Sequence, residues 1–209
     1  MNLDDRREFE EFYKELNIRI KETPDKTNLL RNSLIKQYLD EVKEINKKAN
    51  LGYYPIFIEE LPSYAKDLHK YIKTKVVSDL PQSQLELKAS QRNLEEWVEI
   101  GGILGYDGQL FEIEYAPPNS SNVSVTGEGR ILTSTKLKGK SLDSPDFIRS
   151  KAIIDWHTHP EISMLSTSDL LRIVFITKNI DYFFNDKPFF TVLYIPEIDH
   201  FSWYKAVKF

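Results

Sequence analysis

Apolar residues recur every three or four positions in the first part of the chain, with charged residues between them. This spacing places apolar side chains on one face of a helix. It predicts helices over 9–20 and 34–45, and a third helix that begins near Pro62. The apolar face of the third helix would consist of Leu68, Tyr71, Ile72 and Val76. We interpret these faces as packing surfaces, with a groove for a partner protein as the alternative.

The pattern changes near residue 84. Alternating residues over 85–89 predict a strand. Apolar runs on both sides of Asp107-Gly108 predict two strands joined by a tight hairpin. In all, we expect strands over 85–89, 100–106, 110–116, 130–135, 151–159, 189–195 and 200–207, with helices over 91–99, 166–179 and a short stretch after Ser144. The predicted fold class is α/β in the broad sense (α+β), with a helical N-terminal extension over 1–83 and a second domain over 84–209.

Composition excludes several classes of protein. The 209 residues include no cysteine, which excludes a disulfide framework, a cysteine-ligated zinc site and a cysteine nucleophile. The net charge of −4 gives no basic footprint for nucleic acid. The sequence has neither a secretory leader nor a run of about 18 apolar residues. We therefore expect a cytoplasmic protein that binds neither nucleic acid nor membranes.

Two of the four histidines, His157 and His159, are two positions apart in a predicted strand. Such residues point to the same face, so both rings could bind one metal ion. The alternative is a pair of surface or packing histidines. Ser166 and Asp169 follow at the start of a predicted helix, with the spacing of a capping box. If this helix begins beside the histidine strand, Asp169 completes a set of two histidines and one carboxylate, which is typical of catalytic zinc.

Hydrolysis at such a site needs a general base for the attacking water. The candidate is Glu99, which lies just before Gly101-Gly102. Glycines weaken a strand unless another backbone or a ligand approaches closely. The alternative is that Glu99 belongs, with Glu95 and Glu96, to an exposed helix face.

Together, Glu99 before the paired glycines, His157-x-His159-Pro160 and Ser166-x-x-Asp169 resemble the JAMM motif of the MPN-domain zinc metalloproteases. The resemblance covers roughly residues 84–209. It implies a curved mixed β-sheet flanked by helices, with one zinc ion per chain held by His157, His159 and Asp169. It also implies that Glu99 transfers the proton of the attacking water and that Ser166 stabilises the developing oxyanion.

The resemblance implies hydrolysis of a peptide or isopeptide bond after the tail of a ubiquitin-like or sulfur-carrier protein. A phage-type processing peptidase and a non-catalytic MPN scaffold are the alternatives, and the N-terminal helical region could bind a partner in either case. The sequence departs from the family pattern between His159 and Asp169, where the loop is one residue shorter than usual, which bears on the placement of Ser166 and Asp169. The long insertion of eukaryotic deubiquitinases before the last strands is also missing.

Residues 117–129 are rich in turn formers. They could receive a substrate tail as an added strand, or form a hairpin with no such role. We interpret His69 and His200 as packing or surface residues. We expect Asp155 to face away from the two histidines of the predicted site.

Overall fold

The computed structural model describes residues 53–56, 60–87, 98–116, 145–160 and 187–206, together with positions 36, 40, 91, 165 and 169. The predicted helices over 9–20 and 34–45 lie outside these residues, apart from Lys36 and Asp40, which are both helical. Most of the predicted helices over 91–99 and 166–179 also lie outside them, as do residues 117–144, which include the turn-rich segment 117–129 and the strand predicted over 130–135.

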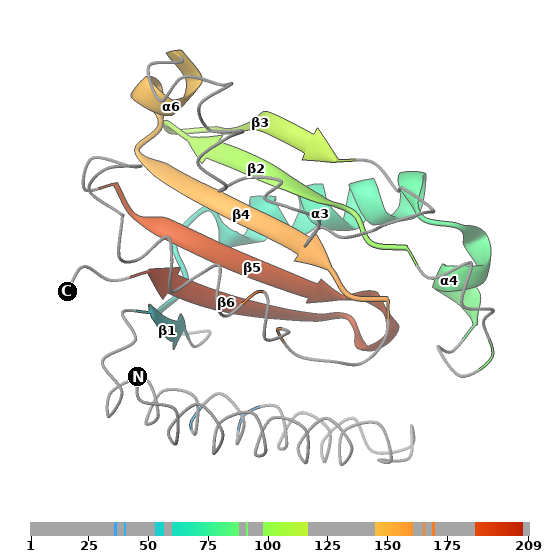
Figure 1. Cartoon of the computed structure of the whole chain (residues 1–209). Helices are drawn as coiled ribbons and strands as arrows, with labels where there is room; N and C mark the ends of the chain where they lie inside the picture. Colours follow the sequence, from blue (N-terminus) through green and yellow to red (C-terminus); the bar gives the residue numbers. More distant parts are fainter. Residues whose placement is uncertain are drawn as a thin grey trace.

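A six-stranded mixed sheet forms the centre of the described structure (Figure 1). The strands β4 and β5 are parallel, and all other neighbouring pairs are antiparallel. The architecture is therefore α+β, and the strands predicted over 100–106, 110–116, 151–159, 189–195 and 200–207 are confirmed, with bounds that differ by a residue at some ends. In spatial order the strands are β1 (Tyr53–Ile56), β6 (His200–Ala206), β5 (Phe189–Ile195), β4 (Ala152–Thr158), β2 (Gly101–Tyr106) and β3 (Leu110–Ala116).

The predicted hairpin joins β2 to β3. Gly108 has a φ of 129° in this turn, a backbone conformation that residues with a Cβ atom rarely adopt. The predicted short helix after Ser144 is α6 (Pro145–Arg149), and a 3₁₀ turn, η4 (Pro196–Ile198), connects β5 to β6. Both the hairpin and the short helix are thus as the sequence predicts.

The helix α3 (Ala65–Asp79) crosses one face of the sheet (Figure 1). Leu68, Ile72 and Val76 are spaced by four residues, and all three are buried in the apolar core. The helix ends at Asp79, and the N–H of the next residue, Leu80, donates to the Val76 carbonyl oxygen. The prediction of a third helix with this apolar face is confirmed. Within the described residues, no helix has both the length and the apolar character needed to cross a membrane.

The strand predicted over 85–89 is wrong at its start, because residues 85 and 86 belong to the short helix α4 (Gln82–Glu86). The helical turn brings the side chain of Gln84 into the interior, where it bonds both backbone polar groups of Val98. The alternation of Leu and Glu in this segment is too short to separate a strand from a helical turn.

The strand β1 was not predicted, because it lies in the region expected to be helical and contains Pro55. It pairs with β6 at the edge of the sheet, from Tyr53 opposite Ala206 to Ile56 opposite Trp203. Since α3 also packs on the sheet, residues before position 84 supply both an edge strand and a core helix to it.

Side chains along β4 alternate between the two faces of the sheet. Ala152, Ile154 and Trp156 belong to the apolar core that α3 covers. Asp155 and His157 therefore lie on the opposite face, and both are buried there. The prediction that Asp155 faces away from the histidines is wrong, because residues two apart on a strand point to the same side.

Candidate metal centre

The two histidines of the predicted site lie at the end of β4, in the middle of the sheet. All seven residues of β4 are buried between β2 and β5. His157 is the sixth of them, and His159 follows the last. The N–H of His159 donates to the Tyr194 carbonyl oxygen of β5 at 3.1 Å, so the chain keeps its direction beyond the strand. The strand thus delivers both rings to one place.

Asp169 joins the two histidines in space, as predicted. The Nε2 atoms of His157 and His159 are 3.2 Å apart. The Asp169 oxygens lie 3.6 Å from Nε2 of His157 and 3.5 Å from Nε2 of His159. All three residues are buried. Asp169 is therefore within reach of both rings, although the segment between His159 and Asp169 is one residue shorter than in the JAMM motif.

These distances fit a single metal ion. Ligands at about 2.0–2.1 Å in a tetrahedral arrangement lie roughly 3.3–3.4 Å from one another. The three measured separations, 3.2, 3.5 and 3.6 Å, lie close to that spacing. Two histidines and one carboxylate also leave a fourth position for water, as in catalytic zinc sites.

The electrostatics of the cluster suit a bound cation or a shared proton. Two imidazole nitrogens and a carboxylate converge in the interior, and an isolated ionised carboxylate is costly to bury. A cation or a shared proton at the point of convergence would offset that cost. The Nδ1 atom of His157 is buried and makes no hydrogen bond within the described structure, so this ring makes its polar contacts through Nε2.

Comparisons of the chain with protein-family models, with curated proteins and with solved structures found no match. The resemblance to the JAMM motif thus rests on the residues themselves.

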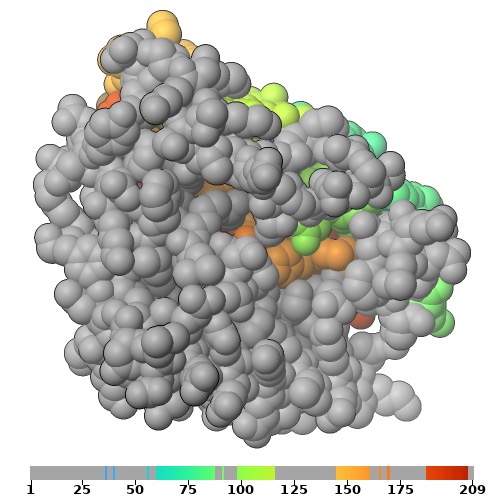
Figure 2. Space-filling model, viewed as in Figure 1, coloured from blue at the N-terminus to red at the C-terminus, as the bar shows by residue number. Residues whose placement is uncertain are grey.

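Glu99 lies just before β2, which pairs with the histidine strand. Gly101 is opposite His157, and the N–H of Thr158 donates to the Ile100 carbonyl oxygen at 2.9 Å. The same register, continued by two more pairs beyond Gly101 and His157, would set Glu99 opposite His159. Glu99 is half-buried, so its side chain is in part accessible to solvent. Figure 2 shows orange atoms of the segment around β4 next to green atoms of the segment around β2 at the molecular surface.

The predicted close approach at the paired glycines is present. A Cβ atom at Gly101 would lie 2.5 Å from the Trp156 carbonyl oxygen and 3.0 Å from the His157 Cβ atom. A Cβ atom at Gly102 would lie 2.3 Å from the Glu114 carbonyl oxygen of β3. The glycines therefore let β2 lie close to the backbone on both of its sides, including the part of β4 that carries His157.

The remaining site prediction, Ser166, lies outside the described residues, so its role stays a prediction. Two residues at the site were not predicted. Gln84 and Thr158 bond the backbone on either side of Glu99. The position of Thr158 between the two histidines was a possible signal, whereas nothing near Gln84 in the sequence points to the site.

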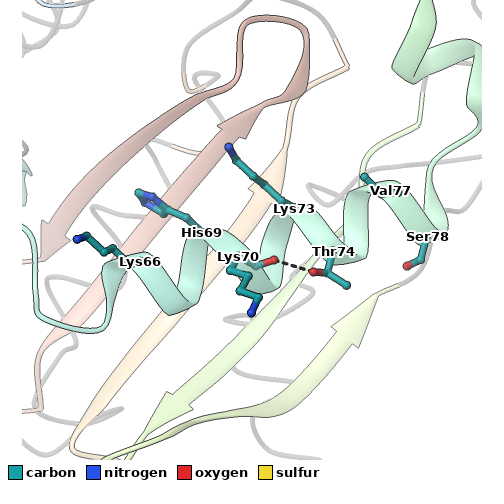
Figure 3. Close-up of a pocket in the computed structure, with 7 residues that line it drawn as sticks. All are labelled: Lys66, His69, Lys70, Lys73, Thr74, Val77 and Ser78. Carbon is teal, nitrogen blue, oxygen red and sulfur yellow. Dashed lines mark hydrogen bonds between the residues drawn. The ribbon is translucent and has the colours of Figure 1, made fainter.

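A separate open groove of about 700 Å³ follows the outer side of α3, on the face of the sheet opposite His157 (Figure 3). Among the described residues that line it are Lys66, Lys70 and His69. Nε1 of Trp203 donates to Nε2 of His69 at 2.9 Å, and Phe201 stacks on the ring at 3.8 Å. Burial, followed by the charge of Lys73, lowers the pKa of His69 to about 4. His69 is thus a packing residue, in agreement with its interpretation from the sequence.

Proposed function

We propose that this chain is a zinc-dependent metallopeptidase of the JAMM type, with an MPN-like fold. The observation that carries the proposal is the convergence of His157, His159 and Asp169 at distances that suit one ion. Two further features support it. The position of Glu99 next to the histidine strand suits a general base, and a mixed sheet with a helix on its other face agrees with the implied fold.

Zinc bound by these residues would polarise the scissile carbonyl and acidify the attacking water. Glu99 would accept a proton from that water and later donate it to the leaving amine. In the same scheme, the hydroxyl of Ser166 would donate a hydrogen bond to the oxyanion that develops on the carbonyl. The proposed substrate is a peptide or isopeptide bond after the Gly-Gly tail of a ubiquitin-like or sulfur-carrier protein.

The first test measures zinc by elemental analysis on untagged protein that has been purified without chelator. We expect about one zinc ion per chain, as a site with three protein ligands and an open position binds one ion. His157→Ala should lose it. Zinc absent from the parent protein, with the fold intact, would contradict the proposal and favour the non-catalytic scaffold.

The second test is cleavage of a panel of ubiquitin-like and sulfur-carrier fusions that carry a reporter after the Gly-Gly tail. Glu99→Gln should keep its zinc and lose cleavage, because the amide cannot accept the proton. If this variant cleaved at the parent rate, Glu99 would not be the base. A zinc-loaded parent protein that cleaves phage-type peptides and none of the fusions would favour the processing peptidase.

A further inference from the structure

Glu99 lies between two residues whose backbones are held by side chains from other elements. Residues 98–100 precede β2 and are not themselves in a strand. Val98 is bonded by the side chain of Gln84, and Ile100 by that of Thr158. Both contacts are long-range, because the bonded residues are separated by 14 and 58 positions in the sequence. The backbone of Glu99 is thus restrained from both sides.

The amide of Gln84 binds Val98 as a neighbouring strand would. Its Nε2 atom donates to the Val98 carbonyl oxygen at 2.7 Å, and its Oε1 atom accepts from the Val98 N–H at 3.0 Å. Gln84 and Val98 are each 4% exposed. Buried polar groups are costly when their hydrogen bonds are not made, so this pair of bonds favours one placement of Val98.

Thr158 uses its side chain where a regular strand pair would use the backbone. Its Oγ1 atom accepts from the Ile100 N–H at 3.0 Å, a bond that the Thr158 carbonyl oxygen would otherwise receive. Its own N–H donates to the Ile100 carbonyl oxygen at 2.9 Å. These two bonds with Thr158 keep Ile100 in register at the end of β4. The chain then continues to His159, which pairs with β5.

We propose that Gln84 and Thr158 are positioning residues, which together fix Glu99 in front of the histidine cluster. The inference rests on the proposed function, since it assigns these residues a role through Glu99. Neither side chain needs to touch the metal or the substrate. Through the bonds of Gln84 to Val98, the helix α4, which lies outside the motif, thus restrains the position of the proposed base.

The experiment compares Gln84→Met and Thr158→Val, which keep the approximate volume of each side chain and remove its hydrogen bonds. Thr158→Ser retains the hydroxyl and serves as the rescue variant. Gln82→Met is the matched control, because Gln82 is exposed in the same helix and, among the described residues, its side chain bonds Glu86 alone. Each full-length protein is measured for zinc content, for backbone amide exchange, and for kcat and KM on the Gly-Gly fusion that the parent cleaves.

We expect Gln84→Met and Thr158→Val to keep their zinc and their KM, and to lower kcat by roughly 10- to 100-fold, as small misplacements of catalytic groups do. Exchange should become faster at the Val98 amide in the first variant and at the Ile100 amide in the second, but not at Val192 in β5. Thr158→Ser and Gln82→Met should behave as the parent.

Three results would overturn the inference. A parent kcat in both variants, despite faster exchange at Val98 and Ile100, would show that the restraint does not govern Glu99, and would leave the proposed function intact. Loss of zinc in either variant would show that the residue supports the ligands instead. A zinc-loaded parent protein that cleaves no member of the panel would remove the proposed function and this inference with it.

Discussion

Gly101 lies directly opposite His157 in the pairing of β2 with β4, with no room for a side chain between them. A Cβ atom there would press on the Trp156 carbonyl oxygen, which is backbone and cannot rotate away. Alanine at this position would therefore push β2 away from the part of β4 that carries the proposed ligands.

We expect Gly101→Ala to lower the free energy of unfolding by about 1–3 kcal/mol, as overpacking does. Because the displaced strand borders His157, zinc affinity should also fall, by roughly tenfold or more. Gly108→Ala is the control, since a Cβ atom there meets nothing within 4 Å but takes on a strained φ of 129°. It should cost stability by urea unfolding and leave zinc affinity, measured by chelator competition, unchanged. Equal zinc affinities in the two variants would contradict the expectation.

Removal of the metal should lower thermal stability. If zinc binds the folded chain but not the unfolded chain, a free zinc concentration of about 100 times the Kd would add about 2.7 kcal/mol to the free energy of unfolding. Treatment with chelator should therefore lower Tm, and added zinc should restore it. Asp169→Ala should abolish the response, whereas Asp67→Ala, an exposed carboxylate on α3, should keep it. A parent protein with the same Tm in zinc and in chelator would argue against a metal at the cluster.

Trp156 anchors the histidine strand on the α3 side of the sheet. Its side chain is fully buried, and its ring lies 6.1 Å from that of Tyr71 and 6.4 Å from that of Tyr115. Trp156→Ala should lower the free energy of unfolding by about 3–5 kcal/mol, because a large cavity would remain. Trp156→Phe should cost much less. Similar urea midpoints for the two variants would show that the ring is not packed as described.

Stability should fall in mild acid, partly through His69. Its pKa is about 4 in the folded chain, below its ordinary value of 6.5. Between these values the unfolded chain binds a proton that the folded chain does not, so stability is complete above pH 6.5 and decreases as the pH falls toward 4. Lys73, Asp199 and His200 surround this ring and set its charge environment. The ring is partly exposed, so the contribution of His69 to the slope should stay well below the one-proton limit of about 1.4 kcal/mol per pH unit.

His69→Gln tests this assignment. The glutamine oxygen can still accept the hydrogen bond from Trp203 Nε1, but it does not titrate. Urea unfolding at several pH values between 4 and 7 should therefore show a smaller decrease than in the parent. Burial also lowers the pKa of His200 to about 4, so part of the decrease should persist. An unchanged slope would assign the whole effect to other groups.

Local patterns were enough to predict the centre of the fold. Long apolar runs in β4 and β5, and the Asp107-Gly108 turn between two such runs, have few alternative interpretations. The pair of histidines could also be predicted from the local sequence, because side chains two positions apart on a strand lie on the same face. The misplacement of Asp155 came from a wrong application of that alternation.

The remaining features depend on contacts between distant residues. The strand β1 is short and contains proline, so only its pairing with β6 makes it a strand. In the helix α4, the side chain of Gln84 bonds Val98, 14 positions further along the chain, and no pattern within five residues can predict that contact. The hydroxyl of Thr158 likewise acquires its role only when Ile100 is beside it.

The edge position of β1 has a consequence for any shortened form of this protein. A chain that began at residue 84 would lack both β1 and α3, and would present the bare backbone edge of β6 together with the apolar surface of Ile154 and Trp156. Unpaired strand edges next to exposed apolar surface promote self-association. The motif-bearing half of the sequence should therefore aggregate when it is produced alone.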